Sequence, residues 1–195
     1  MPDVLKYNQE VYRKCIHMSS SIIAILLWIL GKDVFLPFIM SATIFFLIID
    51  YLRIYIRTLE KFYSTLFGSV TRHYEYHRFS GASWVFIGSA ATIFLFNEKV
   101  AIISLLVMSL SDSAAAIIGI KYGRTYLFNK SLEGSSAFFI TSSIIIISLS
   151  PALFIVNIIA VLTSVVIELL STPVLNDNLF IPVATGIILT VGGVV

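Results

Sequence analysis

The stretch VAIISLLVMSLSDSAAAIIGI, residues 100–120, decides the fold class, because it is an apolar run long enough to cross a membrane as one helix. A transmembrane helix needs about 20 predominantly apolar residues. Six further apolar blocks occupy residues 18–31, 34–49, 81–96, 135–149, 152–171 and 179–195. The sequence therefore predicts an all-α polytopic membrane bundle of about seven transmembrane helices, which forms a single domain over residues 1–195.

The composition supports a membrane protein. The chain has 195 residues, of which 58% are apolar and 12% are charged, whereas a soluble chain is about 45–50% apolar and roughly 25% charged. The single cysteine, Cys15, excludes an intrachain disulfide and a cysteine-built metal site. Residues 18–31 are short for a span unless the preceding helix extends them. A secretory signal is the alternative there, but Gly31-Lys32-Asp33 follows instead of small residues.

Basic residues alternate between the predicted loops. Of the thirteen Lys and Arg residues, all but Lys32 and Lys99 lie in residues 1–17, 50–80 and 121–134. With seven spans, these three segments face one side of the membrane, and basic loops face the cytoplasm. The pattern predicts a cytoplasmic N-terminus and a C-terminus on the opposite side.

The segment DYLRIYIRTLEK, residues 50–61, has polar residues at intervals of three and four. This spacing is typical of an amphipathic helix. We expect a helix that continues out of the second span and lies on anionic headgroups at the cytoplasmic surface.

Four polar residues before the first span share one helical face, since Glu10, Arg13, Lys14 and His17 follow the spacing i, i+3, i+4, i+7. Such a stripe could bind phosphate. A basic collar that reaches out of the membrane toward the headgroups is an equally good interpretation.

Asp112 is the carboxylate inside the apolar run of residues 100–120. A charged side chain there costs roughly 2.5–3.5 kcal/mol on insertion scales, which makes it a candidate functional residue. The small residues that follow would let a helix or a ligand approach closely: Ala114, Ala115, Ala116 and Gly119. Simple helix packing, with Asp112 paired to a basic residue, is the alternative.

The segment KSLEGS, residues 130–135, begins the fifth span. A helix N-terminus offers free N–H groups to an anion, and Gly134 and Lys130 would assist phosphate binding. An ordinary helix cap by Ser131 or Glu133 explains the same residues.

Together, Asp112 with its alanines, Gly119 and Gly123, followed by residues 130–135, resemble the integral-membrane lipid kinases that use CTP. These are the yeast-type diacylglycerol kinases, dolichol kinases and phytol kinases, which are related to phosphatidate cytidylyltransferases. Further similar positions are Arg13, Lys14, His17, Arg72, Glu75, Arg78, Gly81, Glu168, Asp177, Asn178 and Pro182.

This chain departs from the family pattern at two places. Asn176 stands where an aspartate is common, which removes one carboxylate from a metal site. Ile120 and Lys121 stand where an arginine commonly follows the first glycine, so Lys121 or Arg124 would carry that charge. The chain also lacks the extra spans of dolichol kinases, which argues against dolichol as substrate.

The resemblance implies transfer of the γ-phosphoryl group of CTP to a membrane lipid alcohol, either diacylglycerol or an isoprenoid alcohol, at the cytoplasmic face and with Mg²⁺. Phosphoryl transfer depends mainly on positioning and charge neutralisation. The catalytic residues implied are Asp112, Lys130, Arg13 and Lys14. Those implied to bind nucleotide or phosphate are Gly119, Gly123, Arg124, Ser131, Glu133, Gly134, Ser135, Arg72, Arg78 and Asn178.

Asp112 and Asp177 are the implied metal ligands, with His17 and Glu168 as further site residues. Whether Asp112 would bind Mg²⁺ or act as general base toward the acceptor hydroxyl stays open. ATP stays possible as donor. A cytidylyltransferase that forms a CDP-lipid is the nearest rival, and a small-solute transporter is a more distant one. We expect membrane lipids as partners and no nucleic acid.

Overall fold

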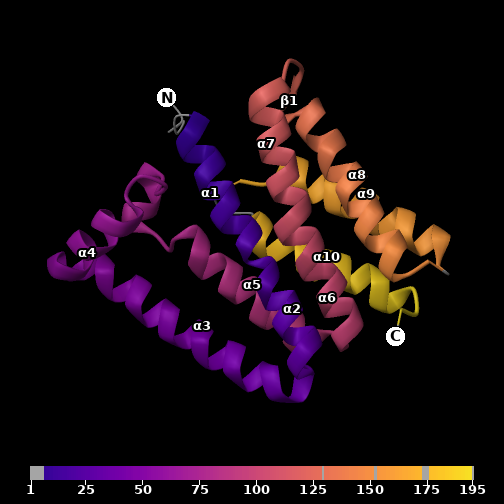
Figure 1. Ribbon diagram of the computed structural model, residues 1–195, viewed down its shortest axis with the longest axis horizontal. Helices are drawn as coiled ribbons and strands as arrows, with labels where there is room; N and C mark the ends of the chain where they lie inside the picture. The colour runs from indigo at the N-terminus through magenta and orange to yellow at the C-terminus, as the bar shows by residue number, and fades with distance from the viewer. Residues whose placement is uncertain (1–6, 129, 152, 173–175, 195) are drawn as a thin grey trace.

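The computed structural model describes residues 7–128, 130–151, 153–172 and 176–194 as a helical bundle (Figure 1). Its helices are α1 (Tyr7–Ser19), α2 (Ser21–Leu30), α3 (Lys32–Tyr55), α4 (Arg57–Phe67), α5 (Gly81–Leu95), α6 (Glu98–Leu106), α7 (Asp112–Tyr122), α8 (Leu132–Leu149), α9 (Phe154–Leu170) and α10 (Asp177–Val191). The structure also has two short helical turns, the 3₁₀ turn η1 (His73–His77) and the π-helical turn η2 (Val107–Ser111). A hairpin is formed by β1 (Tyr126–Leu127) and β2 (Lys130–Ser131).

The all-α membrane class is confirmed. Four continuous helical stretches are long and apolar enough to cross a membrane, and three shorter apolar helices accompany them. The long stretches are Tyr7–Leu30, Lys32–Tyr55, Glu98–Tyr122 and Leu132–Leu149, and the shorter ones are α5, α9 and α10. These seven segments coincide with the seven predicted blocks, whose residues 152 and 195 lie outside the described residues. The number of membrane crossings stays a prediction.

The first block is extended by the helix before it, as its short length required. α1 and α2 follow one another almost in line, so that residues 7–30 form one apolar stretch (Figure 1). Gly31, at φ +76°, then makes the turn into α3, a backbone conformation that suits glycine.

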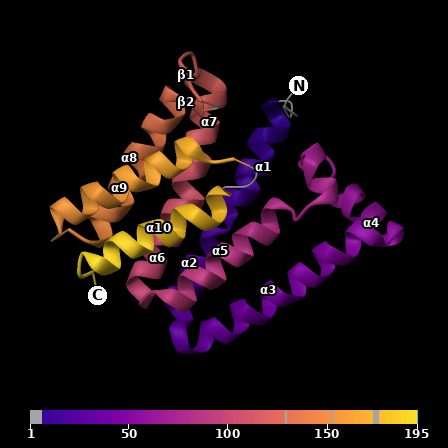
Figure 2. The same cartoon turned by 180° about the vertical axis from the view of Figure 1, so that it is seen from behind.

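Small residues set the closest helix contacts. α8 packs against α7 where Gly134 faces the Ala115 carbonyl oxygen, and a Cβ on Gly134 would come within 2.7 Å of that atom. α10 crosses the bundle between α9 and α5 (Figure 2). It contacts α5 at Gly88, which leaves room for the Asn178 carbonyl group. The prediction that small residues after Asp112 admit another helix is therefore confirmed.

The apolar core connects these elements. Most of its members lie on helices α2, α3 and α5–α10 and on η2, and the largest are fully buried. They include Leu27, Ile39, Ile93, Ile103, Phe138 and Leu189.

The amphipathic segment differs from the prediction for residues 50–61. The backbone leaves the helical conformation at Ile56, with φ −104° and ψ +105°, so these residues divide between α3 and α4. Asp50 and Arg53 form an ion pair and are 4% and 2% exposed. Their predicted place on headgroups is wrong, because the η1 segment and the start of α5 cover them. α4 has no buried side chain and remains amphipathic.

We predict that Gly88→Ala separates α5 from α10 and lowers the free energy of unfolding by about 1–3 kcal/mol, as overpacking does. A Cβ at this position would overlap the Asn178 carbonyl group. Thermal unfolding in detergent measures the change. Gly81→Ala is the control, because its Cβ would make only ordinary contacts, at 3.7 Å and 3.9 Å. An equal Tm for both variants would contradict the packing argument.

Candidate functional site

Polar side chains from α1, the start of α7, β2, the end of α9 and the start of α10 meet inside the bundle. Figures 1 and 2 show how these elements are arranged. We call Lys14, His17, Asp112, Lys130, Ser135, Glu168 and Asp177 the inner cluster. Its central residue, Asp112, directly follows the π-helical turn η2. Single π-helical turns inside α-helices occur frequently at functional sites.

Asp112 is 2% exposed and is held by two residues of α1. Its Oδ2 atom forms an ion pair with the Lys14 ammonium and lies 3.3 Å from His17 Nε2. The predicted helical stripe of α1 therefore does bring Lys14 and His17 together, and both contact the Asp112 carboxylate. The other oxygen, Oδ1, is buried and accepts no hydrogen bond from the described residues.

Lys130 connects the remaining carboxylates of the inner cluster. Its Nζ lies 3.1 Å from Glu168 Oε1 and 3.9 Å from Asp177 Oδ2. The other Glu168 oxygen accepts a hydrogen bond of 2.9 Å from the Ser135 hydroxyl. Burial lowers the pKa of the Lys130 ammonium, but the surrounding carboxylates, led by Asp177, raise this pKa by more. Lys130 therefore keeps its charge at neutral pH.

A second group, which we call the outer cluster, consists of Glu10, Arg13, Arg72 and Glu75. Glu10 Oε1 receives Arg13 Nη2 at 2.9 Å and Arg72 Nη2 at 2.8 Å, which joins α1 to the segment before η1. Burial raises the pKa of the Glu75 carboxyl group, although neighbouring arginines partly offset this shift. Glu10 and Arg13, the first two residues of the predicted α1 stripe, thus lie beside Arg72, another predicted site residue.

The predicted glycines make close packing contacts. A Cβ on Gly119 would lie 2.7 Å from Ser131 Oγ, and Gly123 lies against the same serine. Ser131 Oγ accepts a hydrogen bond of 3.1 Å from Gly134 N, which is the ordinary cap that the sequence left open. A phosphate-binding role for Gly119, Gly123, Ser131 and Gly134 stays a prediction.

Four other predicted residues lie outside both clusters. Arg124 is exposed, and Glu133 Oε1 accepts a hydrogen bond of 3.3 Å from Thr125 N. Arg78 is exposed, and its carbonyl oxygen accepts from Arg53. Asn178 Nδ2 donates to the Gly81 carbonyl at 3.4 Å, so it links α10 to α5.

Sequence reasoning missed the ion pair of Asp50 and Arg53, which contacts the outer cluster through the Glu75 carbonyl oxygen. The available signal was the i, i+3 spacing of two opposite charges directly after an apolar block.

The described residues contain no group of three or more His, Cys, Asp or Glu side chains arranged to hold a metal ion. Mg²⁺, however, usually binds one or two carboxylates together with substrate phosphates. The unpaired Oδ1 of Asp112 suits that arrangement. The residues therefore fit a cation that arrives with a nucleotide.

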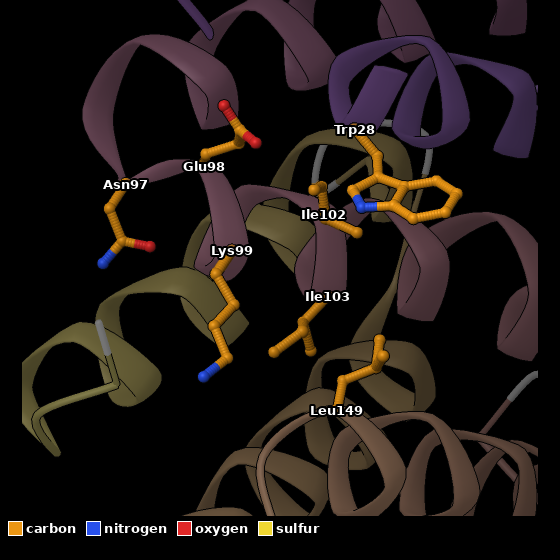
Figure 3. Close-up of a pocket in the computed structure, with 7 residues that line it drawn as sticks. All are labelled: Trp28, Asn97, Glu98, Lys99, Ile102, Ile103 and Leu149. Atoms are coloured by element: carbon orange, nitrogen blue, oxygen red, sulfur yellow. The ribbon is translucent and has the colours of Figure 1, made fainter. Parts of the chain in front are cut away.

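A separate cavity of about 500 Å³ lies near the turn between α5 and α6 (Figure 3), and none of its lining residues belongs to either cluster. Its lining is mostly apolar, with three polar residues at the turn. The lining residues are Trp28, Asn97, Glu98, Lys99, Ile102, Ile103 and Leu149.

Known proteins resemble this chain along most of its length. The CTP-dependent diacylglycerol kinase 1 of Saccharomyces cerevisiae is 36% identical over 138 residues, which are 68% of this chain and 47% of the yeast protein. An uncharacterized protein of Rickettsia prowazekii is 30% identical over 193 residues, which are 91% of this chain and 92% of that protein. An uncharacterized protein of Methanocaldococcus jannaschii is 31% identical over 179 residues, 89% of each chain.

The fold and the inner cluster define a polytopic helical membrane protein with a buried ionic site. The chain belongs to the family of CTP-dependent lipid kinases that includes the yeast protein. It spans about half the length of that yeast relative. No family model matches the chain, and no solved structure matches it.

We predict that Lys14→Met lowers the free energy of unfolding by about 3–5 kcal/mol, because it leaves the buried Asp112 carboxylate without its cation. The double variant Lys14→Met/Asp112→Asn should recover much of this loss, since no charge then stays unpaired. Thermal unfolding in detergent compares the two. A double variant that is no more stable than Lys14→Met would show that the pair does not carry this energy.

Proposed function

We propose that the protein phosphorylates diacylglycerol at the cytoplasmic face of a membrane, with CTP as phosphoryl donor. The observation that carries the proposal is the inner cluster, in which one buried oxygen of Asp112 has no hydrogen-bond partner among the described residues and lies near lysine side chains. The name of the yeast relative supports both the donor and the acceptor.

The charges of the inner cluster support a divalent cation in the reaction. Three carboxylates, of Asp112, Glu168 and Asp177, face two ammonium groups, so the cluster carries a formal net charge of −1 with His17 neutral. A bare triphosphate would be repelled by this net charge, whereas Mg²⁺ would neutralise it. When bound, Mg²⁺ supplies positive charge to the phosphate oxygens.

The residues of both clusters would then have different roles in the reaction. Lys130 and Lys14 would hold phosphate oxygens, and Arg13 with Arg72 would neutralise the outer part of the triphosphate. Asp112 Oδ1 would contact either the cation or the acceptor hydroxyl, whose proton it would accept in the second case. The bond between the γ-phosphorus of CTP and the oxygen that bridges to the β-phosphate breaks, and the hydroxyl oxygen bonds to the γ-phosphorus. The hydroxyl loses its proton, and the products are CDP and phosphatidate.

The cytoplasmic placement rests on the charge pattern of the loops. The basic segment of residues 50–80 contains Arg72 and Glu75 of the outer cluster, and the basic segment of residues 121–134 contains Lys130 of the inner cluster. A soluble nucleotide and a lipid hydroxyl can meet only at a membrane face, and nucleotides are cytoplasmic.

We predict that only γ-labelled CTP transfers its label to lipid, with diacylglycerol as acceptor. The assay offers α-labelled and γ-labelled CTP, with ATP in parallel, to the purified protein in mixed micelles. Isoprenoid alcohols and phosphatidate are the comparison lipids. Transfer of the α label to phosphatidate would instead show a cytidylyltransferase, and no transfer to any acceptor would refute the proposed kinase.

We predict that Asp112→Asn lowers kcat by at least about 10³-fold, because the free Oδ1 loses its charge. Asp33→Asn is the matched control, since Asp33 is exposed at the start of α3. Both variants should elute from gel filtration like the wild type. Retained turnover in Asp112→Asn would remove this carboxylate from the mechanism.

Metal dependence separates the two roles of Asp112. If Oδ1 binds Mg²⁺, residual turnover of Asp112→Asn requires a higher Mg²⁺ concentration than the wild type. If Oδ1 accepts the hydroxyl proton, the Mg²⁺ requirement is unchanged and the fall in rate disappears at higher pH.

A further inference from the structure

The buried Asp50–Arg53 pair holds together three segments that come from different parts of the chain. Arg53 Nε forms the ion pair with Asp50, and Nη2 donates to the carbonyl oxygens of Glu75 and Arg78 at 2.8 Å and 2.9 Å. The guanidinium also stacks over the Tyr63 ring, 4.2 Å from its centroid. One side chain of α3 thus contacts the middle of η1 and the residue that follows it, and also contacts α4.

Asp50 makes the matching set of contacts at the start of α5. Its Oδ2 accepts from Ser80 N at 2.7 Å and from the Ser83 hydroxyl at 2.6 Å. Because Oδ1 pairs with Arg53, both carboxylate oxygens are occupied. The pair therefore fixes the chain from Glu75 to Ser83, and this segment leads into α5, which packs on α10.

The fixed segment carries functional groups toward α1. Arg72 immediately precedes η1 and reaches Glu10, while Glu75 lies within it and is buried. These contacts place the outer cluster relative to the inner one. Neither Asp50 nor Arg53 belongs to either cluster, so their effect on the site is exerted through η1.

We propose that Asp50 and Arg53 are positioning residues, which hold residues 72–78 against α1 so that the outer cluster can bind the nucleotide's phosphates. This inference rests on the proposed function. It requires arginine specifically, because a single lysine ammonium cannot reach the carboxylate and both carbonyl oxygens in the same fixed geometry.

The test is Arg53→Lys, with Arg57→Lys as the matched control because Arg57 is exposed on α4. We expect Arg53→Lys to raise the KM for CTP about tenfold while kcat changes by less than about twofold, since binding and not chemistry is affected. Trypsin cleavage after Arg72 or Arg78, followed by mass spectrometry, should become several-fold faster. The control should match the wild type in both measurements.

An unchanged KM, or a fall in kcat alone, overturns the inference. If wild-type protein transfers no phosphate, the proposed function has failed, and the cleavage rates alone decide whether the pair holds the segment: equal rates overturn it. If Arg53→Lys does not purify as a folded protein, Ser83→Ala replaces it, because it removes one hydrogen bond to Asp50. The expected rise in KM is then about two- to threefold, and an unchanged KM and cleavage rate overturn the inference.

Discussion

The buried carboxylate of Asp112 is the constraint on which the arrangement of the bundle depends. An aspartate inside an apolar helix must find a cation, because an unpaired buried charge is strongly destabilising. Lys14 supplies this charge from the beginning of the chain, so α1 must lie against α7 although almost a hundred residues separate the two. The same requirement acts on Glu168, whose partner Lys130 brings β2 and α8 toward α9.

The helix contacts then determine how closely these charges approach. Gly134 allows α8 to lie against α7, and Gly88 allows α5 to lie against α10. If either contact were wider, the ion pairs would have to cover a longer distance. Gly134 of the family pattern and Gly88 thus have packing roles that act on the candidate site from outside it, while the carboxylates and lysines form the candidate site itself.

The helices and several residues of the candidate site were predictable from the sequence, whereas the pairing of their charges was not. Long apolar blocks and a charge within one of them are local patterns, so the helices, Asp112 and the α1 stripe were found. Partner choice is a tertiary property: the sequence allowed phosphate, headgroups or a carboxylate for Lys14, and only the fold selects Asp112. The burial of Asp50 and Arg53 depends likewise on η1, which carries no apolar pattern of its own.

The ion pairs also constrain how a nucleotide could bind. Every lysine of the inner cluster already contacts a carboxylate, so a phosphate group must displace one of these contacts before it gains a lysine. A divalent cation near Asp112 Oδ1 would weaken the attraction between that carboxylate and Lys14, which would free the ammonium for a phosphate oxygen. Metal and nucleotide would therefore favour each other's binding, because each satisfies the charge that the other releases.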